Sequence, residues 1–169
     1  MRTLVLGGIR SGKSQWAESA IVDAVGPGEP VRYVATGPAH DSDPAWSARV
    51  EAHRARRPAH WSTVETTCLA TVLHDDGSAM LIDDLGGWLT AHLADPPVDE
   101  LICAVKGFGA PLVVVSPEVG LSVIPATESG RRFADELGAL NQRFADLCDR
   151  VVLIVAGQPM IVKDAGDRP

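Results

Sequence analysis

The chain has 169 residues, 46% hydrophobic and 22% charged, which predicts one globular domain with a core of its own. Its net charge of −7 argues against a protein that mainly binds nucleic acid or an anionic membrane surface, so a bound nucleotide would need a local cluster of cations. No apolar run approaches the roughly 20 residues that span a bilayer, and we expect neither a signal peptide nor membrane insertion.

The number and spacing of the cysteines indicate the cellular compartment. Cys68, Cys103 and Cys148 are odd in number and show no C-x-x-C spacing. Since disulfides and zinc sites need paired or closely spaced cysteines, we expect these three to be core thiols of a reduced protein. The compartment predicted on this basis is the cytoplasm.

In chain order, the first features are a short apolar strand at 3–6, a glycine-rich stretch and a helix at 13–25. The stretch fits G-x-x-x-x-G-K-[ST], whose glycines let backbone N–H groups turn toward a phosphate at a helix N-terminus. Lys13 would reach the terminal phosphates, and the Ser14 hydroxyl would bind Mg²⁺. The alternative is a glycine-rich turn without a ligand, but the strand, loop and helix that the motif requires are all present. The predicted triphosphate-binding residues are Gly7, Gly8, Ile9, Arg10, Ser11, Gly12, Lys13 and Ser14.

The rest of the chain alternates apolar strands with helices. Strands or extended pieces are predicted at 31–35, 61–64, 79–82, 111–116 and 151–155, with a turn at 157–159. Helices are predicted at 44–55, 66–74, 86–93, 99–106 and from 127, the last with an inner stripe of Phe133, Leu137, Leu140, Phe144 and Leu147. This order predicts a P-loop NTPase-like α/β fold with a mostly parallel sheet flanked by helices, in one domain over 1–163. Residues 164–169 are expected to form a flexible tail.

Ligands of an open α/β sheet bind beyond the carboxyl ends of its strands. Asp83 directly follows an apolar strand and is the candidate partner of Ser14 for Mg²⁺. Its alternative role, for which Asp84 also qualifies, is to cap the next helix. Glu118 follows another strand and could contact substrate or metal, or order its own loop.

His53 ends a predicted helix and is followed by Arg54, Arg56 and Arg57. These arginines would gather phosphate charge near an imidazole, which could then act as a nucleophile. The alternatives are a core or interface histidine and a solvated basic helix end. Spacing alone does not decide between a catalytic and a structural His53.

Several stretches carry a resemblance to a known family. In chain order they are residues 7–14, 33–36, His53, 57–61, Glu65, 81–83, 118–120, 124–125, 132–135, Gly138 and 141–142. The run Arg57-Pro58-Ala59-His60-Trp61 and the pair Asn141-Gln142 are more specific than the glycine-rich loop, which many NTPases share. Over nearly its whole length the sequence resembles the bifunctional adenosylcobinamide kinase/adenosylcobinamide-phosphate guanylyltransferases of cobalamin biosynthesis.

The resemblance implies two reactions on a RecA-like fold. First, the hydroxyl of the aminopropanol arm of adenosylcobinamide takes the γ-phosphate of ATP or GTP, with Lys13 as a catalytic residue and Mg²⁺ as cofactor. Then His53 attacks the α-phosphate of GTP, expels pyrophosphate and carries GMP to the cobinamide phosphate, giving adenosylcobinamide-GDP. It also implies a homotrimer. Besides the glycine-rich loop, the implied nucleotide contacts are Ala35, Thr36, Gly37, Arg54, Ala55, Arg56, Arg57, Glu65 and Asp83.

The sequence departs from the family pattern at one loop. Pro117 stands where the family commonly has Asn, and residues 121–123 replace a glycine-rich continuation. Both changes would stiffen the loop after residue 116. Two other functions remain open: a regulatory P-loop NTPase, and a monofunctional small-molecule kinase in which His53 is structural.

Overall fold

The computed structural model describes residues 1–37, 51, 54–74 and 77–165. The predicted helix at 44–55 lies mostly outside these residues, and so does His53. Residues 54–56, at its predicted end, are helical.

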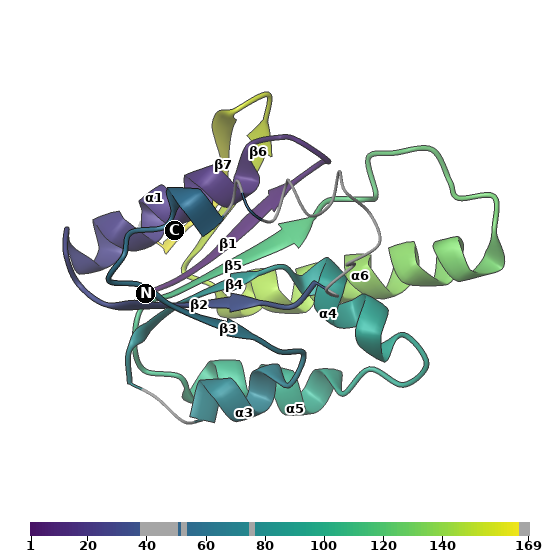
Figure 1. Ribbon diagram of the computed structural model, residues 1–169. Coiled ribbons are helices and arrows are strands. Elements are labelled where there is room, and N and C mark those ends of the chain that lie inside the picture. Colours follow the sequence, from purple (N-terminus) through teal and green to yellow (C-terminus); the bar gives the residue numbers. More distant parts are fainter. Residues whose placement is uncertain (38–50, 52–53, 75–76, 166–169) are drawn as a thin grey trace.

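Strands and helices alternate as the sequence predicts, with boundaries that differ by a few residues (Figure 1). The strands are β1 (Arg2–Gly7), β2 (Val31–Ala35), β3 (Ser62–Glu65), β4 (Ala79–Asp83), β5 (Leu112–Pro117), β6 (Arg150–Val155) and β7 (Gln158–Asp164). The helices are α1 (Lys13–Val25), α3 (Leu69–His74), α4 (Leu85–His92), α5 (Val98–Gly107) and α6 (Glu128–Leu147).

In the described part of the chain, seven strands form one sheet in the order β3-β2-β4-β5-β1-β6-β7. Every neighbouring pair is parallel except β6 and β7. Strand β5 separates β1 from β4, which is the arrangement of RecA-like P-loop NTPases. The predicted fold class is therefore confirmed.

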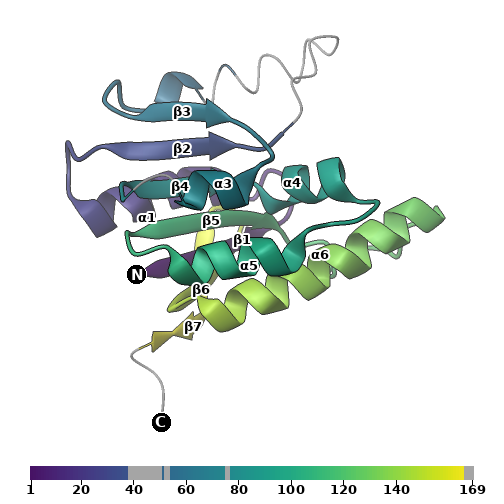
Figure 2. The ribbon, with the colours of Figure 1, turned by 90° about the horizontal axis from the view of Figure 1, so that it is seen from below.

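Helices cover both faces of the sheet. In Figure 2, α3, α4, α5 and α6 lie on the near face, and α1 lies behind the sheet. Each face has its own apolar core, one around Trp88 and Phe144 and the other around Ile21 and Tyr33. Strands buried on both faces read as continuous apolar runs, which is why residues 112–115 were recognisable from sequence.

Helix α6 is amphipathic and lays its predicted stripe on the larger core. Leu137, Leu140 and Phe144 are buried, and Phe133 and Leu147 are partly buried. Among the described residues, no helix is both long and apolar enough to cross a membrane.

Strand β7 was not predicted. It pairs antiparallel with β6 through a turn in which Ala156 and Gly157 have φ of 50° and 77°, so Asp164 ends a strand and does not begin a tail. Positive φ at two successive residues is typical of the tight hairpin turn that matches strand twist. Pro159 argued against a strand here, because proline within sheets is confined to edge positions. Strand β7 is such an edge strand.

The cysteines do not share one environment. Cys68 and Cys103 are exposed, so the prediction of core thiols is wrong for these two. Cys148, which directly follows α6, is buried, and burial raises the pKa of its thiol to about 12. Cys103 lies on α5 between buried neighbours, and its outward position follows from helical periodicity.

Candidate functional site

The glycine-rich loop at residues 7–14, here called the phosphate loop, has a conformation that only glycine permits at two positions. Gly12 has φ of 93°, in the left-handed region. A Cβ on Gly7 would lie 2.4 Å from Ser11 Oγ and 2.9 Å from the carbonyl oxygen of Ile154. Residue 7 therefore lies too close to the Ser11 side chain and to the backbone of β6 to carry a side chain without displacement.

Neighbouring elements support the phosphate loop through backbone hydrogen bonds. The Gly157 N–H, in the β6–β7 turn, donates to the Ser11 carbonyl at 2.8 Å, and the Glu118 N–H donates to the Gly7 carbonyl at 3.1 Å. Lys13 Nζ donates to the Gly8 carbonyl at 3.3 Å, which lays the lysine across the loop. Gly157 is a supporting residue that sequence reasoning missed.

The two acids after β4 have different partners. Asp84 Oδ1 accepts from the Gly87 N–H at 2.8 Å and caps α4, while Asp83 Oδ2 accepts from the Tyr33 hydroxyl at 2.5 Å. The capping role thus belongs to Asp84, and Asp83 keeps the metal role as a prediction. Burial, reinforced by the charge of Asp83, raises the pKa of Asp84, and nearby Lys13 opposes this. Burial and the Asp83 charge likewise raise the pKa of the Tyr33 hydroxyl, so it stays protonated and donates.

Strand register brings three predicted contacts into one row. Glu65 pairs with Ala35, Ala35 with Asp83, Asp83 with Val115, and Val115 with Val5 of β1. Partners in a parallel sheet point to the same face, here the face covered by α1. Since neighbouring strands lie about 4.8 Å apart, Glu65 and Asp83 are roughly 10 Å apart along this row.

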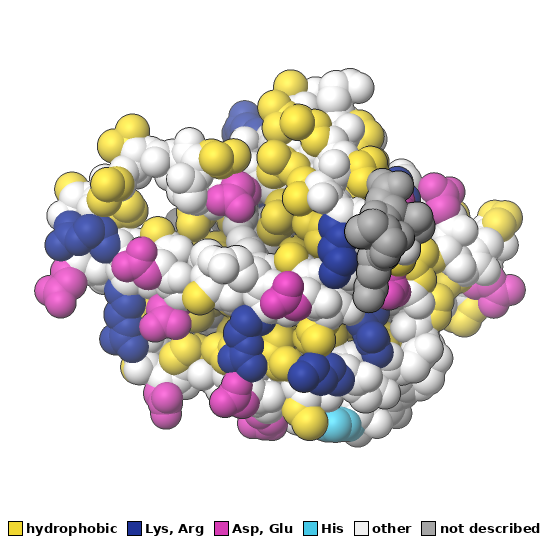
Figure 3. Space-filling model, turned by 180° about the vertical axis from the view of Figure 1, so that it is seen from behind, with side chains coloured by type: hydrophobic (Ala, Val, Ile, Leu, Met, Phe, Trp, Pro, Cys, Tyr) yellow, Lys and Arg dark blue, Asp and Glu magenta, His cyan; other side chains and the backbone are white. Residues whose placement is uncertain are grey.

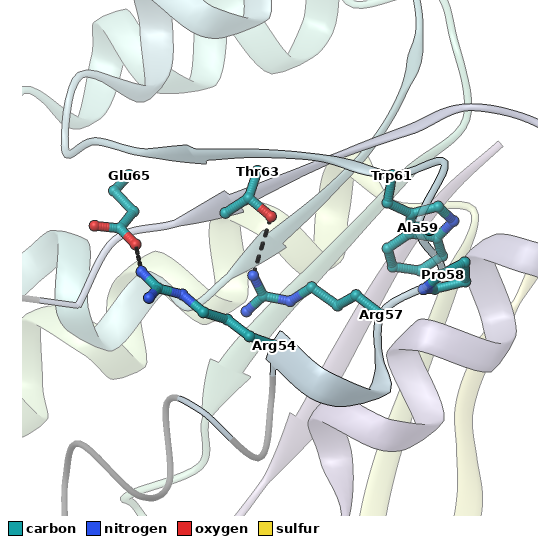
Figure 4. A pocket seen from close by; sticks show the side chains of 7 residues that line it. All are labelled: Arg54, Arg57, Pro58, Ala59, Trp61, Thr63 and Glu65. Carbon is teal, nitrogen blue, oxygen red and sulfur yellow. Dashed lines mark hydrogen bonds and ion pairs between the residues drawn. The ribbon is translucent and has the colours of Figure 1, made fainter.

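Residues 54–57, here called the basic segment, form one wall of an open pocket of about 470 Å³ (Figure 4). Arg54 makes an ion pair with Glu65, and Arg57 Nη1 donates to Thr63 Oγ1 at 3.1 Å. The lining residues are Arg54, Arg57, Pro58, Ala59, Trp61, Thr63 and Glu65.

Two further contacts connect this arginine pocket and the basic segment to α1 and to β2. Arg56 pairs with Glu18 of α1, the helix that begins at the phosphate loop, at 3.2 Å. Arg57 Cζ lies 3.4 Å from the centroid of the Tyr33 ring, whose hydroxyl binds Asp83. These contacts connect the basic segment to the helix that begins at the phosphate loop, and they connect the pocket through Tyr33 to Asp83.

Two side chains that line the pocket also carry buried donor atoms. Arg57 Nε and Trp61 Nε1 are buried and have no hydrogen-bond partner among the described residues. Buried polar groups are nearly always paired, so these two N–H groups are exceptions within the described part of the chain; because they are buried, they do not face the open pocket.

Other predicted contacts have structural roles or are exposed. Thr36 is buried, and its Oγ1 donates to the Asp84 carbonyl and accepts from the Asp84 N–H. Gly37 packs on α4, where a Cβ on Gly87 would lie 3.0 Å from the Gly37 nitrogen. Ile9 is 88% exposed, and Ala55 is also exposed.

The loop after β5 is ordered by its own side chains. Glu118 Oε1 accepts from the Gly120 N–H at 2.7 Å, which matches the loop-ordering role considered for Glu118. Pro117 fits closely against Gly86 at the start of α4, where a Cβ on that glycine would lie 2.8 Å from the proline ring. Buried Asn141 binds Ser116 and the Pro117 carbonyl, which gives the Asn141-Gln142 match a structural reason.

Comparisons with known proteins identify the family. Residues 3–162 match the family described as cobinamide kinase / cobinamide phosphate guanyltransferase. The bifunctional adenosylcobalamin biosynthesis protein CobP of Pseudomonas aeruginosa is 41% identical, with 96% of this chain and 98% of CobP covered. The corresponding CobU proteins of Salmonella typhimurium and Escherichia coli are 35% and 32% identical, with 96% of this chain and 100% of each relative covered.

Solved structures show the same fold. The flagellar accessory protein FlaH from Methanocaldococcus jannaschii aligns with a TM-score of 0.59 at 10% identity, over 96% of this chain and 78% of FlaH. Such low identity supports the fold alone. The near full-length match to the family and its relatives decides the assignment, and the chain belongs to the cobinamide kinase / cobinamide phosphate guanyltransferase family.

Proposed function

We propose that this chain is a bifunctional transferase that phosphorylates adenosylcobinamide and then guanylylates the product. One observation supports this most directly: Asp83 and the arginine pocket lie on the face of the sheet that is covered by α1, the helix that begins at the phosphate loop. The phosphate loop and Asp83 fit a kinase, and the arginines of the pocket fit a second reaction in which charge develops on phosphate oxygens.

In the kinase reaction, the substrate hydroxyl oxygen forms a bond to the γ-phosphorus of ATP or GTP, and the bond from that phosphorus to the bridging oxygen breaks. The nucleoside diphosphate leaves, and the hydroxyl proton is released. Backbone N–H groups of the phosphate loop and the Lys13 ammonium would stabilise the charge that develops on the phosphate oxygens.

The residues present fit a magnesium ion held together with the nucleotide. Among the described residues, no group of three or more His, Cys, Asp or Glu side chains could hold a metal by itself. Mg²⁺ usually binds through one or two protein ligands plus phosphates, and Ser14 and Asp83 would supply these ligands. When bound, the ion would neutralise charge on the terminal phosphates.

In the guanylyl transfer, a nitrogen of His53 forms a bond to the α-phosphorus of GTP, and pyrophosphate leaves. An oxygen of the cobinamide phosphate then attacks the same phosphorus and releases the imidazole. His53 directly precedes the basic segment in sequence. Arg54 and Arg57 line the pocket and would bind phosphate oxygens, as guanidinium groups do in forked geometry. The remaining predicted nucleotide contacts, Ala35, Thr36, Gly37, Ala55, Arg56 and Glu65, are part of the same proposal.

We further infer a homotrimer in the cytoplasm. Large apolar side chains are exposed in two places, on the β6–β7 hairpin and on the loop after β5, and hydrophobic groups gather on two protrusions in Figure 3. They are Val155, Met160, Ile161 and Val162 on the hairpin, and Leu121, Val123 and Ile124 on the loop. An apolar edge strand of this kind favours pairing with another chain. Size-exclusion chromatography with light scattering would give the subunit number.

Labelling tests the proposed function. GTP labelled at the α-phosphate should leave acid-labile label on the wild-type protein and none on His53→Ala. With ATP, both proteins should phosphorylate adenosylcobinamide. Intact kinase activity without any protein label would indicate a monofunctional kinase, and GTP hydrolysis without transfer to cobinamide would indicate a regulatory NTPase.

A further inference from the structure

A single buried side chain contacts both the predicted metal ligand and the arginine pocket. Tyr33, in β2, is 2% exposed. Its hydroxyl donates to Asp83 Oδ2 at 2.5 Å, and its ring is covered by Arg57, whose Cζ lies 3.4 Å from the ring centroid. Tyr33 therefore contacts both the acid after β4 and an arginine of the pocket.

The sheet fixes this placement. Ala35 pairs with Asp83, and Tyr33 lies two residues before Ala35, so Tyr33 and Asp83 point to the same face as diagonal neighbours. Tyr33 pairs with Thr63 of β3, which accepts a hydrogen bond from Arg57. The backbone register thus determines the positions of the Tyr33 hydroxyl and of the Tyr33 ring.

The simplest explanation for a buried tyrosine is packing, with the hydroxyl bonded to whichever acceptor is near. Phenylalanine would fill the same space in the apolar core around α1 without needing an acceptor. Here the hydroxyl binds the predicted metal ligand, and the ring supports an arginine predicted to bind phosphate. Packing alone does not account for both partners.

We propose that Tyr33 is a positioning residue for both reactions: its hydroxyl orients the Asp83 carboxylate toward the metal-bound nucleotide, and its ring orients the Arg57 guanidinium in the pocket. This inference rests on the proposed function, which assigns Asp83 and Arg57 to the nucleotide. Tyr33 acts through these two residues and touches no substrate itself.

Two variants separate the two contacts. Tyr33→Phe removes the hydroxyl and keeps the ring, whereas Tyr33→Leu removes both. The matched control is Val34→Ala, because Val34 is the next residue of β2 and is buried in the core on the opposite face. That control creates a cavity in the same strand without altering either contact.

Two binding constants provide the readouts. Electron paramagnetic resonance measures Mn²⁺ binding to each protein in the presence of an ATP analogue whose γ-phosphate cannot be transferred. Tryptophan fluorescence measures GMP binding in EDTA, since Trp61 lines the pocket. GMP lacks the β- and γ-phosphates that the lysine of a phosphate loop reaches, so its binding depends more on the arginine pocket than that of a triphosphate does.

Tyr33→Phe should weaken Mn²⁺ binding about tenfold or more, the usual effect of removing a group that orients a metal ligand, and should leave GMP binding within about twofold. Tyr33→Leu should weaken both, and Val34→Ala neither. Wild-type Mn²⁺ affinity in Tyr33→Phe, or equal shifts in Val34→Ala, would overturn the inference. If the wild-type protein shows no kinase activity or takes up no label from GTP, the proposed function is overturned. The two binding constants would still decide the role of Tyr33.

Discussion

The phosphate loop and the arginine pocket are built differently. Glycine conformations and backbone hydrogen bonds, such as that from Gly157 to Ser11, set the shape of the phosphate loop. Side chains build the pocket, through the Arg54–Glu65 ion pair and the stack of Arg57 on Tyr33.

This difference determines how the phosphate loop and the arginine pocket respond to mutation. A backbone cradle is fixed by steric limits, so a single methyl group in the wrong place displaces the whole loop. Exposed ion pairs contribute little to stability, so their side chains can be substituted without unfolding the protein. Substitution of single side chains should therefore impair the function of the pocket while the fold persists. The predictions below test this contrast, beginning with the largest effect.

Removing the metal should separate the two parts most sharply. In EDTA, phosphorylation of adenosylcobinamide should stop, because the terminal phosphates lose their counter-charge. GMP binding to the pocket should change by less than about twofold, since arginines alone hold its phosphate. Kinase assays and GMP titrations before and after chelation measure this, and loss of GMP binding on chelation would contradict it.

Gly7→Ala should disable the phosphate loop, because the added Cβ would lie 2.4 Å from Ser11 Oγ and 2.9 Å from the Ile154 carbonyl oxygen. We expect a loss of about 1–3 kcal/mol in unfolding free energy, as for other overpacked sites, and no measurable kinase activity. Gly8→Ala is the control for stability, because its Cβ would meet nothing within 4 Å. Urea denaturation compares the two, and equal stability losses would show that the Gly7 contact is not limiting.

Arg57→Lys should act on the pocket and spare the kinase. Lysine keeps the charge but loses the planar group that stacks on Tyr33 and the fork that binds Thr63. The rate of protein labelling by GTP should fall about 10²-fold, within the range seen when one charge-stabilising donor is lost. Arg143→Lys, an exposed arginine paired with Asp99 of α5, is the control. A kinase rate that falls as far as the labelling rate would argue against separate roles.

The smallest effect should come from the Arg56–Glu18 pair, which joins the basic segment to α1 at 3.2 Å. A double-mutant cycle with Arg56→Ala and Glu18→Ala should give a coupling of about 0.5 kcal/mol in unfolding free energy, decreasing with added salt. A coupling above about 2 kcal/mol would mean that this pair is essential to the docking of the segment.

The same contrast explains what could be predicted from the sequence. The phosphate loop and the buried strands depend on local residue types, such as Gly7, Gly12 and the run 112–115, and were predicted correctly. Strand β7 was missed because its apolar residues are exposed on an edge and Pro159 disguises it. The Tyr33 contacts depend on the pairing of β2 with β3 and β4, which no local pattern encodes. Which of Asp83 and Asp84 caps α4 also depended on tertiary geometry.

The most direct test of guanylyl transfer through His53 is to locate the covalent group. After reaction with GTP alone, trypsin would release residues 50–54, a peptide whose single histidine is His53. Mass spectrometry at alkaline pH should find one guanylyl group on this peptide, lost on mild acid treatment. A guanylyl group on Lys13 or His60, with residues 50–54 unmodified, would contradict the account.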